Sequence, residues 1–431
     1  MTKLALHWQI IIAIVLAAIV GSIVKDLSYG GEVVTLLGIE VNAIFEYVGS
    51  LFLNALKMII VPLIASSIIV GMCGLGSSGA NFTRIGTRTL IFYAATTLIA
   101  ILVGLALINM TSPGYFEGKP VGGLLALDDD DAPAIQSNID QRGPGDVAKI
   151  FLRMVPPNII KAASDGQMLG IIFFSILFGF FVTKLSDDLR QPFYRFWDAT
   201  FKVMMGMTEW IMKFAPIGVF ALVAGVIAKT GFVAAKPLAV FAMTVFAALC
   251  VHALIVLPVL LRVIAKVSPM KMIRAMSPAM LTAFSTASSS ATLPITMKSL
   301  EKNVGVSNNI SSFVLPLGAT VNMNGTALYE CAAALFIAQA YGLELSFAVQ
   351  FTIVVVALLT SIGVAGVPSA SLVAIAIILG AIGLPVEAIG VLMVFDRVLD
   401  MCRTSVNIWG DAVCATIVAR LQGEKTQIDL G

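Results

Sequence analysis

Residues 285–294, with the sequence STASSSATLP, interrupt an uncharged segment that runs from 275 to 297. The whole segment has the length of about 20 residues that crosses a bilayer as a helix. Its small hydroxyl residues and Pro294 divide it into two halves of about ten residues, each too short to cross. The stretch therefore predicts a helical hairpin in place of a spanning helix.

The composition of the rest of the chain places this hairpin in a membrane. Of the 431 residues, 58% are hydrophobic and 12% are charged, and the mean hydropathy is +0.97. A soluble protein has roughly 25% charged residues, so this chain lacks the charge to cover a wet surface. Abundant Gly, Ala and Leu without alternating strands predict an all-α polytopic membrane protein and no β-barrel. Because 27 basic and 25 acidic residues nearly cancel, no nucleic-acid partner is expected.

A second interruption of the same kind follows. Residues 345–386 carry no charge, and their middle, GVAGVPSAS (363–371), is rich in small residues. Each hairpin precedes an apolar segment with a polar break, NMNGT (322–326) after the first and 400–411 after the second. Such paired interruptions are typical of a transporter's binding site. The alternative is two kinked helices with Gly and Ser at close helix contacts.

The last apolar segment, 388–419, contains one polar stripe. At about 100° per residue its members share an arc of roughly 100° on a helix. They are Asp396, Asp400, Arg403, Thr404, Asn407 and Asp411. A charge at mid-membrane costs about 2.5–3.5 kcal/mol on insertion scales, so such residues usually have a function. Asp400 and Arg403 alone would suit an internal ion pair, but the full set exceeds what self-pairing needs.

The chemistry of the stripe suits a zwitterion with an additional carboxylate. Arg403 offers a planar, permanently charged fork that fits a carboxylate. Asp400 is suited to accept from an α-ammonium group, and Thr404 and Asn407 to hydrogen-bond an α-carboxylate. These residues predict an acidic amino acid as the ligand.

A cation and the first hairpin complete this predicted site. Asp411 is a hard anionic oxygen ligand, and Asn322 is a neutral partner for the same cation. At the hairpin tip, Ser288, Ser289 and Ser290 are placed to aim backbone N–H groups and helix ends at substrate oxygens.

These motifs resemble the dicarboxylate/amino acid:cation symporters, a family of excitatory amino acid transporters, archaeal aspartate transporters and bacterial glutamate symporters. The matching stretches are SSSATLP (288–294), LPLGATVNMNGTALYE (315–330), GVAGVP (363–368), LDMCRTSVNIWGD (399–411) and PIGVF (216–220). The resemblance covers essentially the whole chain. It implies eight transmembrane helices plus two re-entrant helical hairpins, inverted repeats, a homotrimer in the lipid bilayer, and an elevator-type movement of a transport domain against a scaffold.

The resemblance also implies individual ligands. For the substrate they are Ser288, Ser289, Ser290, Thr326, Val367, Asp400, Arg403, Thr404 and Asn407. One sodium site would use Gly318, Asn322, Asn407 and Asp411, and a second would use Thr320, Met323, Ser361, Ile362 and Val364, largely through carbonyls. A further site would use Tyr93, Thr96, Thr97, Asn322 and Asn324, and Glu330 matches a glutamate tied to proton carriage and potassium return.

Three departures from the family pattern bear on these roles. Asn324 stands where members with the further sodium site usually have aspartate, so that site is expected to be weak, differently occupied or absent. Members place an arginine at the position of Ala287 or of Met401; this chain has neither, and Arg397 is a candidate replacement. Ser371 stands where glycine is typical, which is expected to alter the second hairpin.

Basic residues in short loops predict the orientation. They occur at Lys3 and in the loops around 84–88, 184–195 and 262–274, whereas the loop 113–148 contains four consecutive aspartates, 128–131. We therefore expect an inner-membrane protein with both termini and the basic loops in the cytoplasm. The expected division is as follows: scaffold helices 1–2 (1–72), transport-domain helix 3 (84–112), extracellular loop (113–148), scaffold helices 4–5 (149–228), transport-domain helix 6 (237–266), hairpin 1 (267–302), broken helix 7 (306–341), hairpin 2 (345–385), helix 8 (386–421) and a cytoplasmic tail (422–431).

Other classes fit less well. An enzyme is not expected, because the chain has only His7 and His252 and lacks the HExxH, GxSxG and phosphate-loop motifs. A channel needs rings of like groups, whereas this stripe suits one solute. The prediction is a secondary active importer of L-glutamate or L-aspartate driven by a sodium gradient, with proton co-transport and potassium counter-transport left open. A C4-dicarboxylate, which has no ammonium group for Asp400, and a neutral amino acid, which leaves Arg403 unpaired, are the alternatives.

Overall fold

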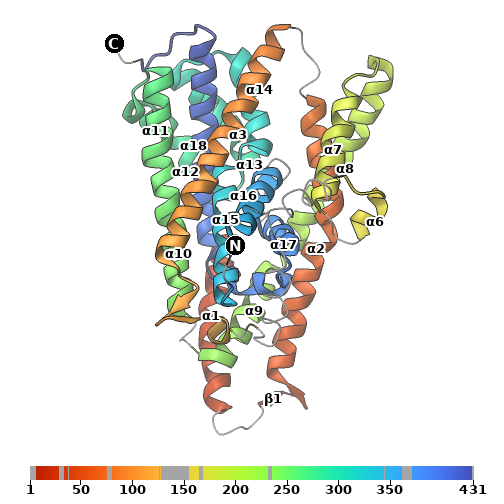
Figure 1. Ribbon diagram of the computed structural model, residues 1–431, viewed down its shortest axis with the longest axis vertical. Coiled ribbons are helices and arrows are strands. Elements are labelled where there is room, and N and C mark those ends of the chain that lie inside the picture. The colour runs from red at the N-terminus through yellow and green to blue at the C-terminus, as the bar shows by residue number, and fades with distance from the viewer. Residues whose placement is uncertain are drawn as a thin grey trace, which may run out of the picture.

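The computed structural model describes residues 6–28, 34–36, 38–74, 80–125, 127, 155–164, 168–231, 235–343, 345–361 and 371–429. This part is mostly helical and elongated (Figure 1). Its α-helices are α1 (Leu6–Leu27), α2 (Val41–Gly74), α3 (Ala80–Thr111), α6 (Ile159–Ser164), α7 (Met168–Val182), α8 (Asp187–Met212), α9 (Ala215–Thr230), α10 (Ala235–Val251), α11 (Leu257–Leu260), α12 (Pro269–Thr286), α13 (Ser289–Ser299), α14 (Asn308–Val321), α15 (Asn324–Ala340), α16 (Phe347–Ser361), α17 (Ser371–Ile382) and α18 (Ile389–Leu421).

Short elements connect these helices. Two antiparallel strand pairs are β1 (Thr35–Leu36) with β2 (Ile39–Glu40), and β3 (Tyr115–Phe116) with β4 (Lys119–Pro120). The 3₁₀ segments are η1 (Gly123–Leu125) and η7 (Val386–Ala388), and the π-helical segments are η4 (His252–Val256), η5 (Leu261–Ala265) and η6 (Leu300–Val304). The segments η4, α11 and η5 continue α10 into one long helix with local changes of winding.

Three helices in the described residues are long and apolar enough to cross a membrane: Trp8–Leu27, Ile85–Thr111 and Ala235–Ala265. Asp187–Ile211 and Ala215–Lys229 form a fourth candidate, bent by 54°. Large apolar side chains on these helices face outward; Leu254, for example, is 63% exposed. A helix that contacts lipid buries such side chains in the bilayer. Shorter apolar helices in the described residues are Val41–Phe52 and Val61–Val70 in α2, Gly170–Val182 in α7 and Val349–Ser361 in α16.

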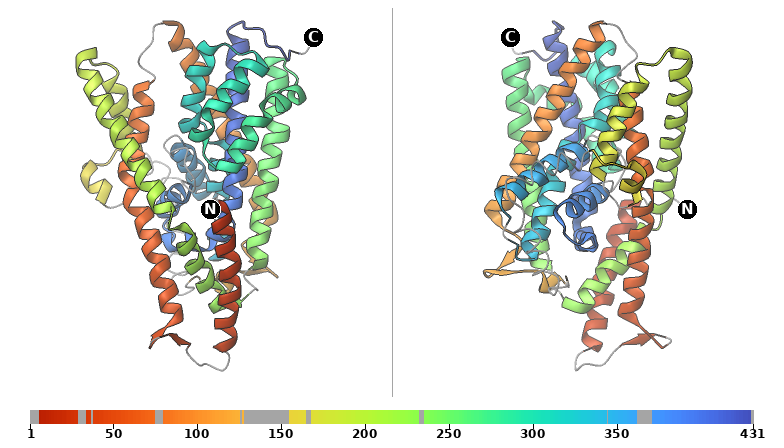
Figure 2. Two further views of the ribbon diagram at one scale, coloured as in Figure 1. Left: turned by 180° about the vertical axis from the view of Figure 1, so that it is seen from behind. Right: turned by 45° about the vertical axis from the view of Figure 1, so that its right-hand side comes forward.

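The helices form two groups. Helix α1 packs against α9, and α2 packs against α7, α8 and α9. In both views of Figure 2, α7 and α8 lie beside α2 on one side of the molecule, and α10 and α11 lie on the opposite side. Close packing of α9 on α2 requires Gly218 of the PIGVF motif, because a Cβ there would lie 2.3 Å from the Phe52 ring.

The first hairpin consists of α12 and α13, which pack against each other. The helix breaks at Ala287, whose backbone is left-handed with φ 50°, and at Ser288, which is extended. Ser288 caps α13 by accepting a hydrogen bond from the backbone N–H of Ala291 at 3.3 Å. The hydroxyl of Thr292 donates to the Ser288 carbonyl at 2.8 Å, which fixes the turn. The turn thus lies inside the small-residue stretch 285–294.

The second hairpin and the broken helix surround the last helix. Helices α16 and α17 pack together, and their connection, 362–370, lies outside the described residues. Helices α14 and α15 are separated by Asn322 and Met323, whose ψ angles of 70° and 61° are not helical. All of α15 is buried, and it contacts α3, α16, α17 and α18. The core of the molecule therefore lies around α15 and α18.

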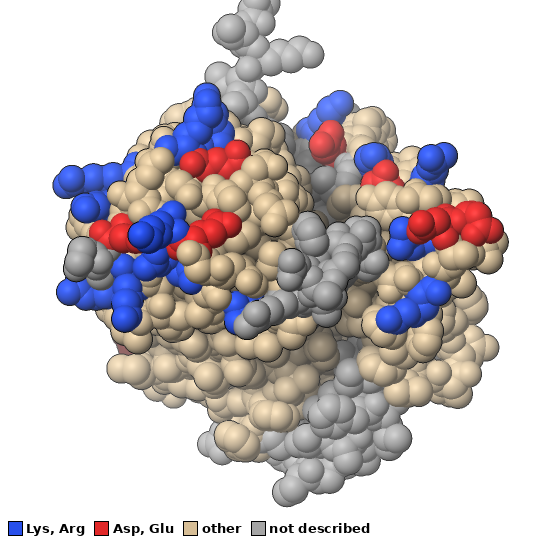
Figure 3. Space-filling model, turned by 90° about the horizontal axis from the view of Figure 1, so that it is seen from above, with Lys and Arg blue, Asp and Glu red and all other residues tan. Residues whose placement is uncertain are grey.

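One end of the molecule is rich in charge. The loops from α7 to α8 and from η5 to α12 lie at the end that carries the C-terminus (Figure 1), and they include the exposed Lys184 and Lys266; the exposed Lys271 follows in the first turn of α12. Seen from this end, lysine and arginine side chains gather in two groups (Figure 3). The chain after α18 folds back on this end, where Asp429 pairs with Val267 in a β-bridge and Glu424 accepts from the backbone N–H of Ser307 at 3.0 Å.

Candidate functional site

The polar stripe of α18 lies inside the protein. Arg403 is completely buried, and every other member is at most 6% exposed. The members lie on one face of a regular helix, so their common direction follows from the spacing alone. Buried charges need ionic or hydrogen-bonding partners, and the following contacts provide them.

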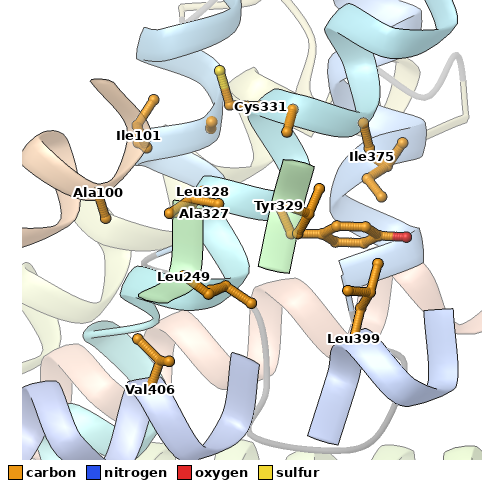
Figure 4. Packing of buried hydrophobic residues seen from close by; sticks show 14 of the residues in the cluster. Ala100, Ile101, Leu249, Ala327, Leu328, Tyr329, Cys331, Ile375, Leu399 and Val406 are labelled. Atoms are coloured by element: carbon orange, nitrogen blue, oxygen red, sulfur yellow. The ribbon is translucent and has the colours of Figure 1, made fainter. Parts of the chain in front are cut away.

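Arg403 is held by two aspartates of its own helix. Its Nη2 donates to Asp400 Oδ1 at 2.8 Å and to Asp396 Oδ1 at 3.2 Å, and its Nη1 also lies 3.2 Å from Asp396 Oδ1. The guanidinium carbon lies 3.9 Å from the ring centroid of Tyr329 on α15. Figure 4 shows the Tyr329 side chain extending between Ile375 of α17 and Leu399 of α18. Arg403 is thus oriented by two carboxylates and an aromatic face.

Asn407 connects the stripe to the start of α15. Its Oδ1 accepts from the backbone N–H of Gly325 at 2.8 Å, and its Nδ2 donates to the hydroxyl of Thr326 at 3.1 Å. A Cβ at Gly325 would lie 2.8 Å from the Arg403 carbonyl, so only glycine allows this approach. Thr404, on the same face, donates its hydroxyl to the Asp400 carbonyl at 2.8 Å. Thr326, Thr404 and Asn407 are therefore adjacent to Arg403 and Asp400.

A second cluster of oxygen atoms lies two turns farther along α18. Asn322 Nδ2 donates to Asp411 Oδ1 at 2.8 Å, and Thr96 Oγ1 lies 3.5 Å from Asn322 Oδ1. A Cβ at Gly318 would lie 2.5 Å from Asp411 Oδ1 and 2.6 Å from the Tyr93 hydroxyl. The Tyr93 hydroxyl itself donates to the Val314 carbonyl at 2.7 Å. Residues from α3, α14 and α18 therefore meet at Asp411.

Asn324 lies beside this cluster. The Thr97 hydroxyl donates to its Oδ1 at 2.7 Å, and its Nδ2 lies 3.4 Å from His252 Nε2. A Cβ at Gly410 would lie 2.8 Å from Asn324 Nδ2, so the amide packs directly on α18. The polar groups in these contacts are amide, hydroxyl and imidazole groups, and none of them is a carboxylate. The set Tyr93, Thr96, Thr97, Asn322 and Asn324 is thus brought into one region between α3 and the helix break.

The serines of the first hairpin tip and the second predicted sodium set have fewer contacts with the stripe in the described residues. At the first hairpin tip, Ser289 is 3% exposed, Ser288 is half-buried and Ser290 is exposed. The hairpin contacts α18 through the Ser405 hydroxyl, which donates to the Met280 carbonyl at 3.1 Å.

The second sodium set is only partly visible. Met323 and Ser361 are buried and Thr320 is half-buried, and no hydrogen bond joins these three to one another in the described residues. Ile362, Val364 and the predicted substrate ligand Val367 lie outside the described residues.

Glu330 is buried on α15 and faces the second hairpin. Thr360 on α16 donates its hydroxyl to Glu330 Oε2 at 3.0 Å, and the same hydroxyl lies 2.9 Å from the Val356 carbonyl. Glu330 Oε1 has no hydrogen-bond partner among the described residues. The only hydrogen bond described for this carboxyl group thus connects α15 to α16.

Comparisons with known proteins identify the family of this chain. The sequence profile of the sodium:dicarboxylate symporter family matches residues 6–421. This chain belongs to the sodium:dicarboxylate symporter family. It is 34% identical over 427 residues to the "Proton/sodium-glutamate symport protein" of Bacillus caldotenax, which covers 98% of this chain and 96% of the relative.

Two further relatives span bacteria and animals. The "Proton/glutamate-aspartate symporter" of Escherichia coli K12 is 35% identical over 420 residues, and the match covers 97% of this chain and 93% of the relative. "Excitatory amino acid transporter 3" of Mus musculus is 34% identical over 467 residues, covering 98% and 87%. The match to a family of symporters agrees with the absence of enzyme motifs in the sequence.

Three residues of this family member were not predicted as part of the site. They are His252 beside Asn324, Tyr329 beneath Arg403, and Thr360 beside Glu330. The signal for His252 was present, since an ionisable group in a span is usually functional. Tyr329 and Thr360 carry no such signal, because their partners lie on other helices. In the described residues no group of three or more His, Cys, Asp or Glu could hold a metal ion, and the five cysteines are unpaired.

Proposed function

We propose that this protein is a secondary active symporter that imports L-glutamate or L-aspartate, driven by a sodium gradient. The observation that carries the proposal is the buried stripe of α18, in which Arg403 and Asp400 lie beside hydrogen-bonding groups of the α14–α15 break. The names of the relatives, which are glutamate or glutamate-aspartate symporters and excitatory amino acid transporters, support the same substrate class.

In the proposed substrate site, each group of an acidic amino acid meets a complementary residue. Arg403 binds the side-chain carboxylate, since a guanidinium fork fits a carboxylate through two hydrogen bonds. Asp400 accepts from the ammonium group, and Thr404 and Asn407 bind the α-carboxylate. Thr326, Val367 and the hairpin tip at 288–290 complete the enclosure, which excludes water and strengthens these interactions.

The proposed sodium ions occupy positions made largely of neutral oxygens. One is bound by Gly318, Asn322, Asn407 and Asp411, where Asp411 supplies the negative charge. The second is bound by Thr320, Met323, Ser361, Ile362 and Val364. At the third position, Tyr93, Thr96, Thr97, Asn322 and Asn324 provide no carboxylate, so we propose that sodium binds there weakly or is absent.

Glu330 is the proposed proton carrier. Its burial and its single hydrogen bond to Thr360 support an exchange between a neutral and a charged form as the hairpin moves. In this scheme the proton enters with the substrate, and the substrate-free protein then carries potassium in the opposite direction.

The proposed architecture follows the two helix groups. A scaffold of α1, α2 and α7–α9 holds a transport domain of α3 and α10–α18 that moves as an elevator, with α12–α13 and α16–α17 as re-entrant hairpins. We propose a homotrimer in the inner membrane, with both termini and the basic loops in the cytoplasm, since basic loops remain on that side.

Uptake of labelled L-aspartate and L-glutamate into proteoliposomes tests the proposal. An inward sodium gradient is compared with an inward proton gradient, each with and without internal potassium. Sodium-driven uptake of either amino acid is the expected result, and stimulation by internal potassium supports the role of Glu330. Uptake driven by protons without sodium overturns the sodium coupling.

A C4-dicarboxylate is the second candidate, favoured by the two buried arginines of α18, Arg397 and Arg403. Succinate and fumarate in the same assay decide between them. Uptake of succinate without either amino acid replaces the proposed substrate class.

A further inference from the structure

Arg397 is a buried guanidinium that the roles above do not use. It is 5% exposed and lies one turn before Asp400 on α18. Its Nη1 forms an ion pair of 3.5 Å with Asp400 Oδ2. In the described part of the chain, its Nε and Nη1 have no hydrogen-bond partner. Because a guanidinium presents five N–H donors and burial without partners is unfavourable, Arg397 has unused capacity to bind an anionic oxygen.

Arg403 has less of this capacity, because among its nitrogen atoms only Nε has no hydrogen-bond partner in the described part of the chain. Its two Nη atoms already donate to Asp396 and Asp400 at 2.8 to 3.2 Å. A substrate carboxylate that approaches Arg403 therefore competes with two fixed carboxylates. The same carboxylate meets no hydrogen-bonded competitor at Nε and Nη1 of Arg397.

Helix geometry places both arginines around Asp400. At about 100° per residue, Arg397 and Arg403 lie about 60° to either side of Asp400. Thr404 lies about 20° from Arg397 on the same count. Arg397 therefore lies at the Thr404 edge of the stripe, about 120° around the helix from Arg403.

The charges favour an anionic group at this position. Asp396, Asp400, Arg397 and Arg403 form a buried cluster whose formal charges cancel. When a substrate ammonium group binds Asp400, it neutralises the only ionic partner described for Arg397. An anion that arrives with this ammonium group restores the balance, and an acidic amino acid carries both groups in one molecule.

We propose that Arg397 is a second guanidinium that binds the side-chain carboxylate of the substrate, an inference that rests on the proposed function. Arg397 then distinguishes an acidic side chain from its amide, because an amide supplies no charge to pair with the released guanidinium. Arg403, held by Asp396, binds the same carboxylate from the other side of Asp400.

The test compares L-aspartate with L-asparagine in wild type, Arg397→Met and Arg397→Lys. Dissociation constants are measured by calorimetry on purified protein in sodium, with competition against labelled L-aspartate for weak ligands. In Arg397→Met, L-aspartate is expected to bind at least about tenfold more weakly, about 1.4 kcal/mol, with less than a twofold change for L-asparagine. Arg274→Met, the same substitution at an exposed arginine of α12, is expected to change neither constant.

Arg397→Lys covers the case in which the methionine variant does not fold. Lysine keeps the charge beside Asp400 but loses the planar fork, so the preference for aspartate over asparagine is again expected to fall. Equal weakening of both ligands means that Arg397 only positions Asp400, and it overturns the inference, as does an unchanged preference. If wild type binds neither acidic amino acid, the proposed function fails; if wild type binds them and the variants keep the preference, this inference alone fails.

Discussion

Arg403 has partners that explain both its position and the consequence of removing it. Two aspartates and the Tyr329 ring hold its guanidinium in a fully buried place. Substitution by cysteine removes the proposed partner of the substrate's side-chain carboxylate and leaves Asp396 and Asp400 with less compensation. Truncating one partner of a buried charge pair costs about 2–5 kcal/mol.

Arg403→Cys is therefore expected to lower the kcat/KM for L-glutamate and L-aspartate uptake at least about a hundredfold. Uptake of neutral amino acids such as L-serine by the variant is expected to be at least as large as in wild type. Proteoliposome uptake measures both, and the unfolding temperature in detergent separates a loss of recognition from a loss of fold. Unchanged glutamate uptake by this variant would falsify the role of Arg403.

Asn324 supplies a neutral amide at the position where a charged cation site has a carboxylate. Its Oδ1 accepts from Thr97, and that hydrogen bond survives replacement by aspartate because a carboxylate also accepts. The Nδ2 side, 3.4 Å from His252, becomes an anionic oxygen in the same position. We expect Asn324→Asp to strengthen sodium binding about tenfold or more, since a charged ligand adds over ~1.4 kcal/mol in a buried site.

Sodium titration of L-aspartate uptake at fixed substrate checks this expectation. Asn309→Asp, at an exposed position of α14, makes the same chemical change away from the site and is expected to leave the titration unaltered. A sodium titration of Asn324→Asp that superimposes on wild type contradicts a cation position at this residue.

Several features of these residues follow from sequence, and others depend on three-dimensional contact. The common face of Asp396 to Asp411 follows from helical spacing, and the turn at Ala287 and Ser288 lies in the small-residue stretch. The contact of Asn324 with His252 does not follow, because the two helical segments that carry them are brought together only by packing. The ion pair of Arg403 with Asp400 follows from their i,i+3 spacing, whereas the additional pair with Asp396, two turns away, was not predicted.

At the scale of the element, the packing of α14 on α18 depends on one glycine. A Cβ at Gly318 would meet Asp411 Oδ1 at 2.5 Å and the Tyr93 hydroxyl at 2.6 Å. Both distances are shorter than real carbon–oxygen contacts, so alanine forces α14 away from α18 or displaces the carboxylate. The contact therefore ties the geometry of a helix pair directly to the proposed cation ligand.

Gly318→Ala is expected to weaken the apparent affinity for sodium in uptake at least about tenfold, which corresponds to ~1.4 kcal/mol. It is also expected to lower the unfolding temperature. Gly380→Ala is the matched control, because a Cβ at Gly380 in α17 would meet no atom within 4 Å and alanine favours the helix by about 1 kcal/mol. Sodium titration and thermal unfolding are measured for both. Equal behaviour of the two variants contradicts close packing at Gly318.

At the scale of the molecule, charge and topology point to one orientation. The exposed lysines of the loops between α7 and α8 and between η5 and α12 lie at the C-terminal end, whereas β3 and β4 lie toward the other end (Figure 1). Basic loops are retained in the cytoplasm during insertion. The end shown in Figure 3 is therefore expected to face the cytoplasm.

Cysteine labelling in intact cells and in inverted membrane vesicles tests this orientation. Lys271→Cys, in α12 at the basic end, is expected to react with an impermeant maleimide only in inverted vesicles, and Lys119→Cys, in β4, only in intact cells. Both lysines are exposed, so reactivity depends on the side of the membrane and not on burial. Wild type provides the background, because its five cysteines are buried or half-buried. The reverse pattern would overturn the expectation that the basic end faces the cytoplasm, because basic loops would then have been moved across the membrane against the usual rule.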